Sequence, residues 1–553
     1  MIDLILKLSK NLVTKSLFYL SIYSSFIIIY LNYDIVYSPD FEKYYNYFLF
    51  YSEGIDSTNL EQGNLYFFFI YLCTLIINSL IGEINNFELL NISVLVGNYI
   101  IYTVALIGFK KYLILNNFNE KKVYLSLIVL NFSPPTLILR MTLKPEILGL
   151  TLIVWSLLYY QLFNTQKNNK NLNLFLLFSV LISTLKVSIF LMFVVLLIFQ
   201  IDLKTLFNDI KPYFKNIALF TLVLLSLHAE NYLMNEMSIF EVSHDEKYNN
   251  SADLEFFTNF NSNELNDNPH KNFHNNSFRA ITLLDTFSDY FELYWNSDHS
   301  NLNSSRKQFI IFKERAQNIE PGQLPVISYE KNNRVLTYSG NINSRYIAED
   351  EGENILDEIR MRAGFYFTIA FYLLVLVYAF RYKNYRAVLL SPFIGIVLIA
   401  VSSLGLFPSK NFDPIIGDSV KTFYYSFFVS ISFVFFLNIT LNIVKKYDKV
   451  LSFLIILFFT FIIGLPTEFN ENINNQKIQK NNYLFTCEIN LAFIEFDEVL
   501  NFQNCNSKNR STSSLEEVKN INLKLSILRI PYFSIFLIVF STYHYYNLRK
   551  RQV

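Results

Sequence analysis

The segment SLFYLSIYSSFIIIYLN (residues 16–32), followed directly by YDIVYSPDFEKYYNYFLFYSEGIDSTNLEQGN (residues 33–64), decides the fold predicted for this chain. The first part has the length and apolar character of one membrane-spanning helix. The second part is rich in tyrosine and gathers the acidic residues Asp34, Asp40, Glu42, Glu53, Asp56 and Glu61. This order predicts an acidic loop held at a membrane surface directly after a membrane span.

Apolar runs of similar length recur along the 553-residue chain, in which 52% of the residues are hydrophobic. The sequence therefore predicts an all-α polytopic membrane protein. The formal net charge is zero, so no bulk electrostatic attraction to nucleic acid is expected. The basic N-terminus carries no small-residue cleavage pattern, so the first span is expected to be retained.

The positions of Lys and Arg orient the spans, because cytoplasmic loops carry an excess of both. Lys7, Lys10 and Lys15 precede the first span, which places the acidic loop outside. The apolar run 66–80 is predicted to lie in the outer interface, as part of the first outer loop. Counting this run as a span would place the next basic turn, around residues 110–122, on the outer side.

The same rule predicts that the long apolar run 172–200 forms two short half-spans hinged near Lys186. Twelve spans result, with both termini in the cytoplasm of a bacterial inner membrane. The other ten are 16–32, 88–113, 123–139, 147–163, 217–232, 364–380, 387–406, 422–444, 450–465 and 525–543.

Three regions follow from this topology. Residues 1–232 form an N-terminal membrane module with the first outer loop at 33–82, and residues 363–553 form a C-terminal module with an outer loop at 466–524. Between them, the extracytoplasmic loop 233–362 contains an amphipathic helix, predicted at 278–295, that lies on the outer leaflet, caps the membrane part or belongs to a small subdomain. Cys487 and Cys505 of the last outer loop could form a disulfide in an oxidising compartment or remain as two thiols.

Ionisable residues near membrane depth are costly and usually functional. On the predicted topology those on the outer side are Asp40, Glu42, Arg140, Lys144, Glu146, Lys186, His228, Glu230 and Lys421. This set suits transfer of a sugar from a polyprenyl-phosphate carrier to an extracytoplasmic glycan, lipid or protein. A carboxylate would serve as general base on the acceptor or orient it, and cations would hold the donor phosphate.

Three segments carry a resemblance to a known superfamily. They are SPDFEKYYNYF (38–48), NFSPPTLILRMTLKPEILG (131–149) and GDSVKTFYYSFF (417–428). Their order resembles that of the GT-C integral membrane glycosyltransferases, which include oligosaccharyltransferase catalytic subunits, protein O-mannosyltransferases, aminoarabinose transferases and the lipopolysaccharide sugar transferases of rhizobia. The chain lacks a counterpart of the W-W-D motif of oligosaccharyltransferases, so glycosylation of protein asparagine is not expected.

The resemblance implies a role for each matched residue. Asp40 takes the catalytic acid position with Glu42 beside it, and Asp40 would also be the ligand of any divalent metal. Arg140 and Glu146 take the second-loop positions, and Lys421 takes that of the basic residue at the lipid phosphate. Together with Lys186, these last three residues are the predicted binding site for the donor phosphate and substrate. No tightly bound cofactor is implied; the lipid-linked sugar is a co-substrate.

Other interpretations stay open. Asp40 suits a helix cap, Arg140 and Glu146 suit a structural ion pair, and Lys186 suits a lysine that extends to the interface. An O-antigen polymerase or ligase would instead use the basic residues of the later loops: Arg279, His299, Arg306, Arg360 and Arg362. A transporter or flippase is the third class, although the mid-spans are largely apolar and no internal repeat is found.

Overall fold

The apolar runs of the sequence fold as helices in the computed structural model. It describes residues 2–32, 65–81, 86–200, 355–404 and 424–463, with short segments at 254–258, 277–284, 286–288, 326–331, 334–339 and 347–350 and a few single positions. The chain divides into two units, one of residues 1–33, 295–352 and 464–553, and the other of residues 34–294 and 353–463.

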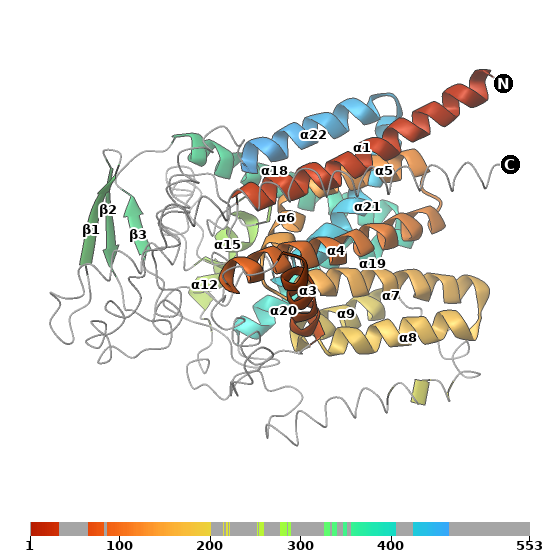
Figure 1. The fold of residues 1–553 in the computed structure, drawn as a ribbon, viewed down its shortest axis with the longest axis horizontal. Helices are drawn as coiled ribbons and strands as arrows, with labels where there is room; N and C mark the ends of the chain where they lie inside the picture. The colour runs from red at the N-terminus through yellow and green to blue at the C-terminus, as the bar shows by residue number, and fades with distance from the viewer. Residues whose placement is uncertain are drawn as a thin grey trace. The chain divides into compact units, whose positions relative to one another are not determined.

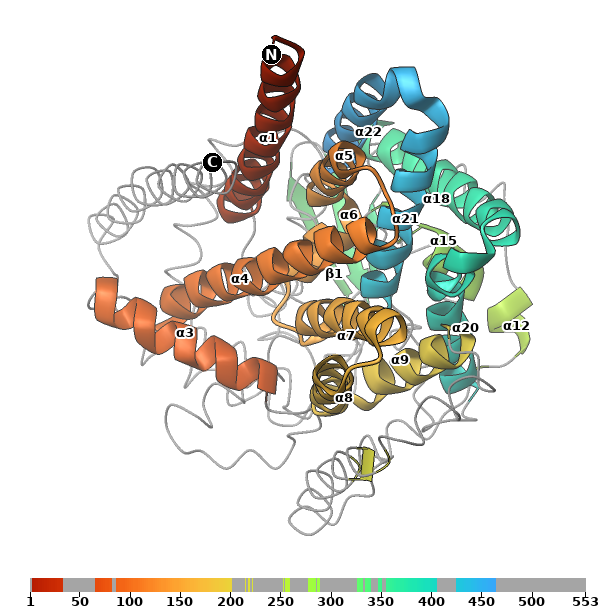
Figure 2. The same cartoon turned by 90° about the vertical axis from the view of Figure 1, so that its right-hand side faces the viewer.

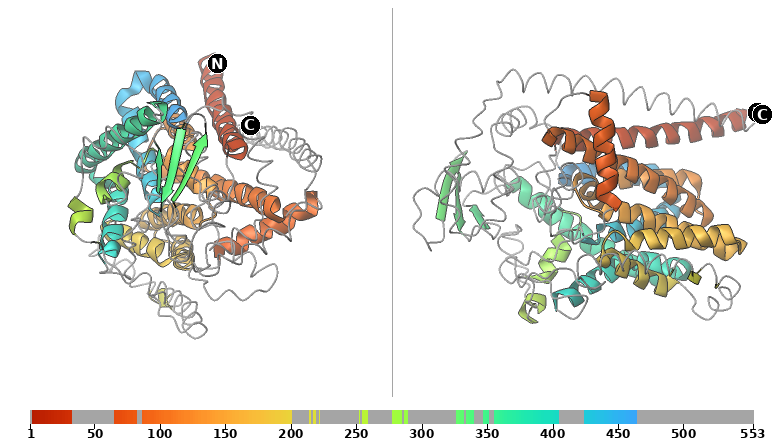
Figure 3. Two further views of the ribbon diagram at one scale, coloured as in Figure 1. Left: turned by 90° about the vertical axis from the view of Figure 1, so that its left-hand side faces the viewer. Right: turned by 60° about the horizontal axis from the view of Figure 1, so that its bottom comes forward.

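The first unit contains helix α1 (Ile2–Asn32), within which the predicted first span lies. It also contains a small antiparallel sheet of β1 (Val326–Lys331), β2 (Arg334–Ser339) and β3 (Ile347–Asp350), in the order β1-β2-β3 (Figure 3). The sheet lies in the large predicted outer loop, for which the sequence predicted only a helix. Its strands are rich in Val, Ile, Thr and Tyr, which favour pleated structure.

The second unit is built from helices (Figure 1). The membrane-sized and shorter helices of its first half are α3 (Leu65–Ile81), α4 (Asn86–Leu115), α5 (Glu120–Asn131), α6 (Pro134–Met141), α7 (Glu146–Gln166), α8 (Asn169–Ser183) and α9 (Val187–Gln200). They are followed by α12 (Leu254–Thr258), α15 (Phe278–Leu284), α18 (Ile355–Arg381), η5 (Lys383–Tyr385), α19 (Arg386–Leu389), α20 (Ser391–Ser403), α21 (Ser426–Val444), η7 (Lys445–Tyr447) and α22 (Asp448–Ile463).

The described helices mark the chain as a membrane protein. Four are long and apolar enough to cross a bilayer, at Ile92–Leu115, Glu146–Gln166, Ile359–Arg381 and Ser426–Ile462, and two bent helix pairs raise the number to six. The polytopic helical class is thus confirmed. The count of twelve stays a prediction, since the predicted spans 217–232 and 525–543 lie outside the described residues.

Two breaks interrupt the apolar runs of the first half. The run predicted as one span at 123–139 is bent by 59° between α5 and α6. Ser133 precedes Pro134 and Pro135 there, and proline cannot donate the backbone hydrogen bond that continues a helix. The second break separates α8 from α9 at Thr184–Lys186, which confirms the predicted interruption near Lys186.

Helix α21 is the central helix of the second unit. Every residue from Ser426 to Ile439 is buried, and the helix contacts α5, α6, α7 and α20. In Figure 2 it lies between α5 and α6 on one side and α18 and α20 on the other. Asn438 donates a hydrogen bond to Ser126 of α5 at 2.6 Å, which pairs two buried polar groups across the core.

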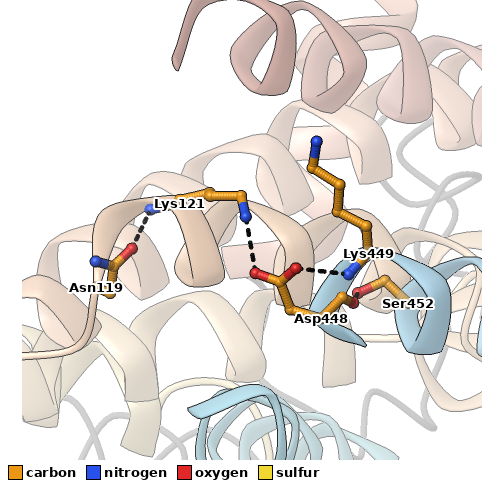
Figure 4. A network of polar contacts seen from close by, with 5 residues as sticks. All are labelled: Asn119, Lys121, Asp448, Lys449 and Ser452. Carbon is orange, nitrogen blue, oxygen red and sulfur yellow. Dashed lines mark hydrogen bonds and ion pairs between the residues drawn. The ribbon is translucent and has the colours of Figure 1, made fainter. Parts of the chain in front are cut away.

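The basic turns of the second unit gather at one end. Lys121 of α5 forms a 2.8 Å ion pair with Asp448 of α22 (Figure 4), and Tyr385 of η5 donates a 2.9 Å hydrogen bond to the carbonyl of Asn116. Helices α4 and α7 run parallel, since Thr151 donates to the carbonyl of Ile101 and Trp155, one turn later, donates to that of Val104. The α7–α8 turn therefore lies at the same end (Figure 1). This end carries Lys110, Lys111, Lys121, Lys122, Lys167, Lys170, Arg381, Lys383, Arg386, Lys445, Lys446 and Lys449.

Helix α3 lies crosswise to α7 and α8, as Figures 1 and 3 show from two directions. One face, with Tyr66, Ile70 and Ile77, is buried, and it packs on α4. The other face exposes the apolar side chains of Phe68, Leu72, Leu75, Ile76 and Leu80. A 17-residue apolar helix in this orientation fits the predicted interfacial helix.

The predicted amphipathic helix 278–295 begins at Phe278, and its described part, α15, ends at Leu284. Its apolar face packs against α18, and the ring of Phe287 contacts those of Phe371, Phe433 and Phe459 from α18, α21 and α22. Of the three interpretations of this segment, the described part agrees with a cap on the membrane helices.

Candidate functional site

The structure describes three of the predicted site residues. Arg140 is in the last turn of α6, Glu146 is the first residue of α7, and Lys186 lies in the break between α8 and α9. All three lie at the end of the unit opposite to the basic turns. Asp40, Glu42, Lys421, His228 and Glu230 lie outside the described residues.

Glu146 and Lys186 form an ion pair, with 3.2 Å between Oε1 and Nζ. The glutamate side chain is 1% exposed and that of Lys186 is 17% exposed. The first turn of a helix favours a carboxylate, because the unpaired N–H groups there carry partial positive charge. Within the described residues Glu146 therefore pairs with Lys186, and not with Arg140 as the structural interpretation of the sequence proposed.

A second lysine and a tyrosine complete what we call the Glu146 cluster, defined as Lys144, Glu146, Lys186 and Tyr424. Nζ of Lys186 lies 4.4 Å from the centroid of the Tyr424 ring, and Nζ of Lys144 lies 5.3 Å from it. Tyr424 lies two residues before the start of α21 and is half-buried, whereas Lys144 is fully buried. Three chain breaks thus bring two ammonium groups onto one aromatic ring, and one of these groups also pairs with the Glu146 carboxylate.

One oxygen of this cluster is unsatisfied. Oε2 of Glu146 is buried and, among the residues that the structure describes, receives no hydrogen bond. Leaving a buried polar atom unpaired costs about 1–3 kcal/mol, and more for a charged group. Such an atom in a native structure requires an explanation, and a bound group or water that donates to it is one.

The segment that carries Lys144 and Glu146 is held from α3 and α4. The amide nitrogen of Asn98 donates to the carbonyls of Arg140 and Thr142 at 3.0 and 2.9 Å. Tyr66 of α3 donates to Oδ1 of Asn98 at 2.9 Å and lies 3.5 Å from the Thr142 carbonyl. Burial raises the pKa of the Tyr66 phenol far above its ordinary value, so that it stays a neutral donor.

Arg140 contacts other residues than the Glu146 cluster. Its guanidinium donates hydrogen bonds to the carbonyls of Thr136 and Asn131 at 2.9 and 2.5 Å and to the hydroxyl of Tyr99 at 2.9 Å. It also lies 4.4 Å from the centroid of the Tyr102 ring. These contacts stabilise the break between α5 and α6, where helical carbonyls have lost their amide donors.

The arginines that an O-antigen polymerase or ligase would use lie on other helices. Arg279 is an exposed residue of α15, and Arg360 and Arg362 are half-buried in the first turns of α18. Arg360 lies 5.9 Å from the centroid of the Phe461 ring, near the end of α22. His299 and Arg306 lie outside the described residues.

Tyr424, Tyr66 and Asn98 were absent from the predicted site, and Lys144 was among the outer-side charged residues but not in the predicted donor-binding set. Lys144 lies in the quoted second-loop segment, two residues before Glu146, and Asn98 is a polar residue in the middle of an apolar run. Both were visible signals. Tyr66 and Tyr424 were not distinguishable among the 38 tyrosines of the chain. The described residues contain no group of three or more His, Cys, Asp and Glu arranged to hold a metal ion.

Comparison with protein families gives one match, to a domain of unknown function, DUF6311, over residues 87–275. The matched segment contains α4 to α9 and hence Arg140, Glu146 and Lys186. Comparisons with curated proteins and with solved structures find no match.

Proposed function

We propose that this protein is a membrane glycosyltransferase that moves a sugar from a polyprenyl-phosphate donor to an extracytoplasmic acceptor. One observation carries the proposal: the buried Glu146 cluster, with its unpaired carboxylate oxygen, lies at the end of the helical unit opposite to the basic turns. Since Lys and Arg accumulate on the cytoplasmic side, this end faces outward.

The chemistry of the cluster fits such a donor. In the reaction the bond between the sugar C1 and the phosphate oxygen breaks, and polyprenyl phosphate leaves with the electron pair. The acceptor oxygen bonds to C1 and loses its proton to a carboxylate, for which Asp40 is the candidate with Glu42 beside it. Lys186 and Lys421 offset the charge that grows on the leaving phosphate.

Arg140 takes a changed place in this proposal. It was predicted as a ligand of the donor phosphate, but its contacts with Asn131, Thr136 and Tyr99 support the helix break beside the cluster. We therefore assign the phosphate to the lysines and keep Arg140 as the residue that fixes their surroundings. A divalent metal at Asp40 stays an open part of the prediction.

A second candidate is an O-antigen polymerase or ligase. The observation that favours it is the pair Arg360 and Arg362 at the start of α18, far along that helix from its basic end at Arg381. In this case the reaction would depend on these arginines and not on the first outer loop. A transporter or flippase would require neither group for chemistry.

The experiment uses a deletion strain of the source organism and intact-mass analysis of its surface glycans and lipids. Loss of a mass equal to one sugar residue, restored by the wild-type chain and not by Asp40→Asn, is the expected result. Restoration by Asp40→Asn, together with failure of an Arg360→Ala, Arg362→Ala double variant, would favour the polymerase or ligase. Unchanged glycan and lipid masses after deletion would contradict sugar transfer to a glycan or lipid, and unchanged intact masses of the surface proteins would contradict transfer to protein.

A further inference from the structure

The unpaired oxygen of Glu146 restricts what can bind beside it. A carboxylate oxygen only accepts hydrogen bonds, so its partner must carry an O–H or N–H group. A phosphodiester has no such donor, and its negative charge is repelled by the carboxylate. The group that meets Oε2 is therefore not the phosphate of the ligand.

The ammonium groups of the cluster have the opposite preference. Each lysine carries three N–H donors, and Lys186 directs one of them to Oε1 of Glu146 at 3.2 Å. Lys144 and Lys186 both lie against the Tyr424 ring, so the positive charge of the cluster is centred on that ring. The cluster thus offers two different positions side by side. Oε2 of Glu146 accepts hydrogen bonds only, and Nζ of Lys186, which contacts the other oxygen of the same carboxylate, attracts anions.

We propose that Glu146 recognises a hydroxyl group of the donor sugar through Oε2, while Lys144 and Lys186 hold the phosphate of the same lipid. This inference rests on the proposed function, because it assigns the two ends of a polyprenyl-phosphate sugar to two parts of one cluster. Glu146 is then a specificity residue that contributes to binding only when the sugar is present. A sugar without the matching hydroxyl would leave Oε2 unpaired, which strongly disfavours it.

The ligand preference can be measured without catalysis. Full-length protein in lipid nanodiscs would be titrated with long-chain polyprenyl phosphate and with the same lipid carrying glucose, galactose, mannose or arabinose. We expect one glycosylated lipid to bind the wild type about tenfold more tightly than the bare lipid, the effect of one hydrogen bond to a charged group.

Three variants separate the parts of the cluster. Glu146→Met should bring the affinity for the preferred glycosylated lipid down to that of the bare lipid, without weakening the bare lipid. Lys186→Met should weaken both lipids by a similar factor. Asp448→Asn breaks the ion pair with Lys121 at the basic end (Figure 4) and should change neither affinity.

The outcomes are distinguishable. Equal weakening of bare and glycosylated lipid by Glu146→Met would overturn the assignment of Glu146 to the sugar while leaving the donor class intact. Failure of the wild type to bind any polyprenyl phosphate would instead overturn the proposed function, and the inference with it. If Glu146→Met does not elute as a folded protein, Glu146→Asp provides the second variant, since it keeps the charge and withdraws the oxygen by one methylene.

Discussion

Arg140 and Glu146 are both buried charged residues six positions apart, yet their surroundings differ in kind. The guanidinium of Arg140 is enclosed by backbone carbonyls, a hydroxyl and two aromatic rings. Glu146 has one oxygen in an ion pair and one oxygen without a donor among the described residues. Buried charged groups are normally fully hydrogen-bonded, so the second oxygen of Glu146 requires an explanation that Arg140 does not.

The buried ion pair allows a prediction of stability. Lys186→Met leaves the Glu146 carboxylate buried without a counter-charge, so we expect a loss of about 3–5 kcal/mol in the free energy of unfolding. The double variant Lys186→Met, Glu146→Met should recover part of this loss, because the buried carboxylate without its lysine partner is removed. Unfolding in detergent, followed by denaturant titration, measures both.

The matched control is the pair at the basic end. Lys121 is 35% exposed, and Asp448 keeps the hydrogen bond from the Lys449 amide, so Lys121→Met should cost less than Lys186→Met. A loss for Lys121→Met as large as that for Lys186→Met would contradict the distinction between the two pairs.

The hydroxyl of Tyr66 gives a second prediction at this scale. Tyr66→Phe removes the donor to Asn98 and should cost about 1–2 kcal/mol, since the amide oxygen loses a buried partner. The double variant Tyr66→Phe, Asn98→Ala should lose less stability than the sum of the losses of the two single variants, because each single variant removes the same hydrogen bond. A double-mutant cycle with strictly additive losses would show that this contact is not energetically significant.

The sequence predicted the members of the site better than their pairing. Glu146 and Lys186 were both identified from charge near membrane depth, but they are 40 residues apart and only the fold brings them together. Arg140 stood closer to Glu146 in the chain and was the partner that spacing favoured. The backbone turns away between them, because Asn98 holds the carbonyls of Arg140 and Thr142 against α4.

At the scale of elements, the two broken helices show what hydropathy patterns contain and omit. The break between α8 and α9 was predicted because an unbroken span would have placed lysines on the wrong side of the membrane. The break between α5 and α6 was missed, although Pro134 and Pro135 mark it, because the apolar run alone had the length of a span. The prolines, and not the length of the apolar run, determine where this helix breaks.

The contact between α20 and α21 depends on a glycine. A Cβ added at Gly395 would collide with Cβ of Tyr425, which is too close to the backbone to rotate away. Gly395→Ala should therefore displace the start of α21 and lower the thermal midpoint of the protein in detergent by several degrees. The movement would also reach Tyr424, the ring of the Glu146 cluster.

Gly97 provides the comparison. A Cβ there would lie 2.6 Å from Cδ1 of Ile70, the far end of a flexible side chain, and at ordinary contact distance, 3.6 Å, from Cys73 and Phe69. Gly97→Ala should thus have a smaller effect on the thermal midpoint. Equal midpoints for the two variants in fluorescence-detected size exclusion would contradict the packing of α20 on α21.

At the scale of the whole molecule, the second unit has two chemically different ends. Its described turns at one end carry many lysines and arginines, with Glu120 and Asp448 as the acids paired to them. At the other end lie the Glu146 cluster and the N-terminal turns of α18. This division supports the orientation predicted from the sequence, because helices that are far apart in the chain place their basic turns at the same end.

The orientation is testable by cysteine labelling in intact cells. We expect Asn169→Cys and Asn384→Cys, both at exposed positions in basic turns, to be protected from a membrane-impermeant thiol reagent. Lys43→Cys, in the first outer loop, should be labelled. Labelling of all three positions from the same side would contradict the interfacial position of α3. Labelling of position 169 without labelling of position 384 would show that these two basic turns do not lie at the same end.

The matched family segment, residues 87–275, contains the helices that carry Arg140, Glu146 and Lys186 but neither the acidic loop nor Lys421. The sequence predicted the helical class and most of the helix positions, since both follow from apolar length. The catalytic assignment to Asp40 rests on motif resemblance and position, and it stays a prediction.

The central position of α21 has a consequence for biogenesis. The ribosome completes α4 to α9 before it makes Ser426–Val444. Until then, the faces of α5, α6 and α7 that α21 covers lack this helix. During that interval Ser126 lacks its partner Asn438, and Lys144 and Lys186 lack the ring of Tyr424. A nascent chain stopped before α21 would thus lack the aromatic ring that covers two lysines of its α4–α9 segment.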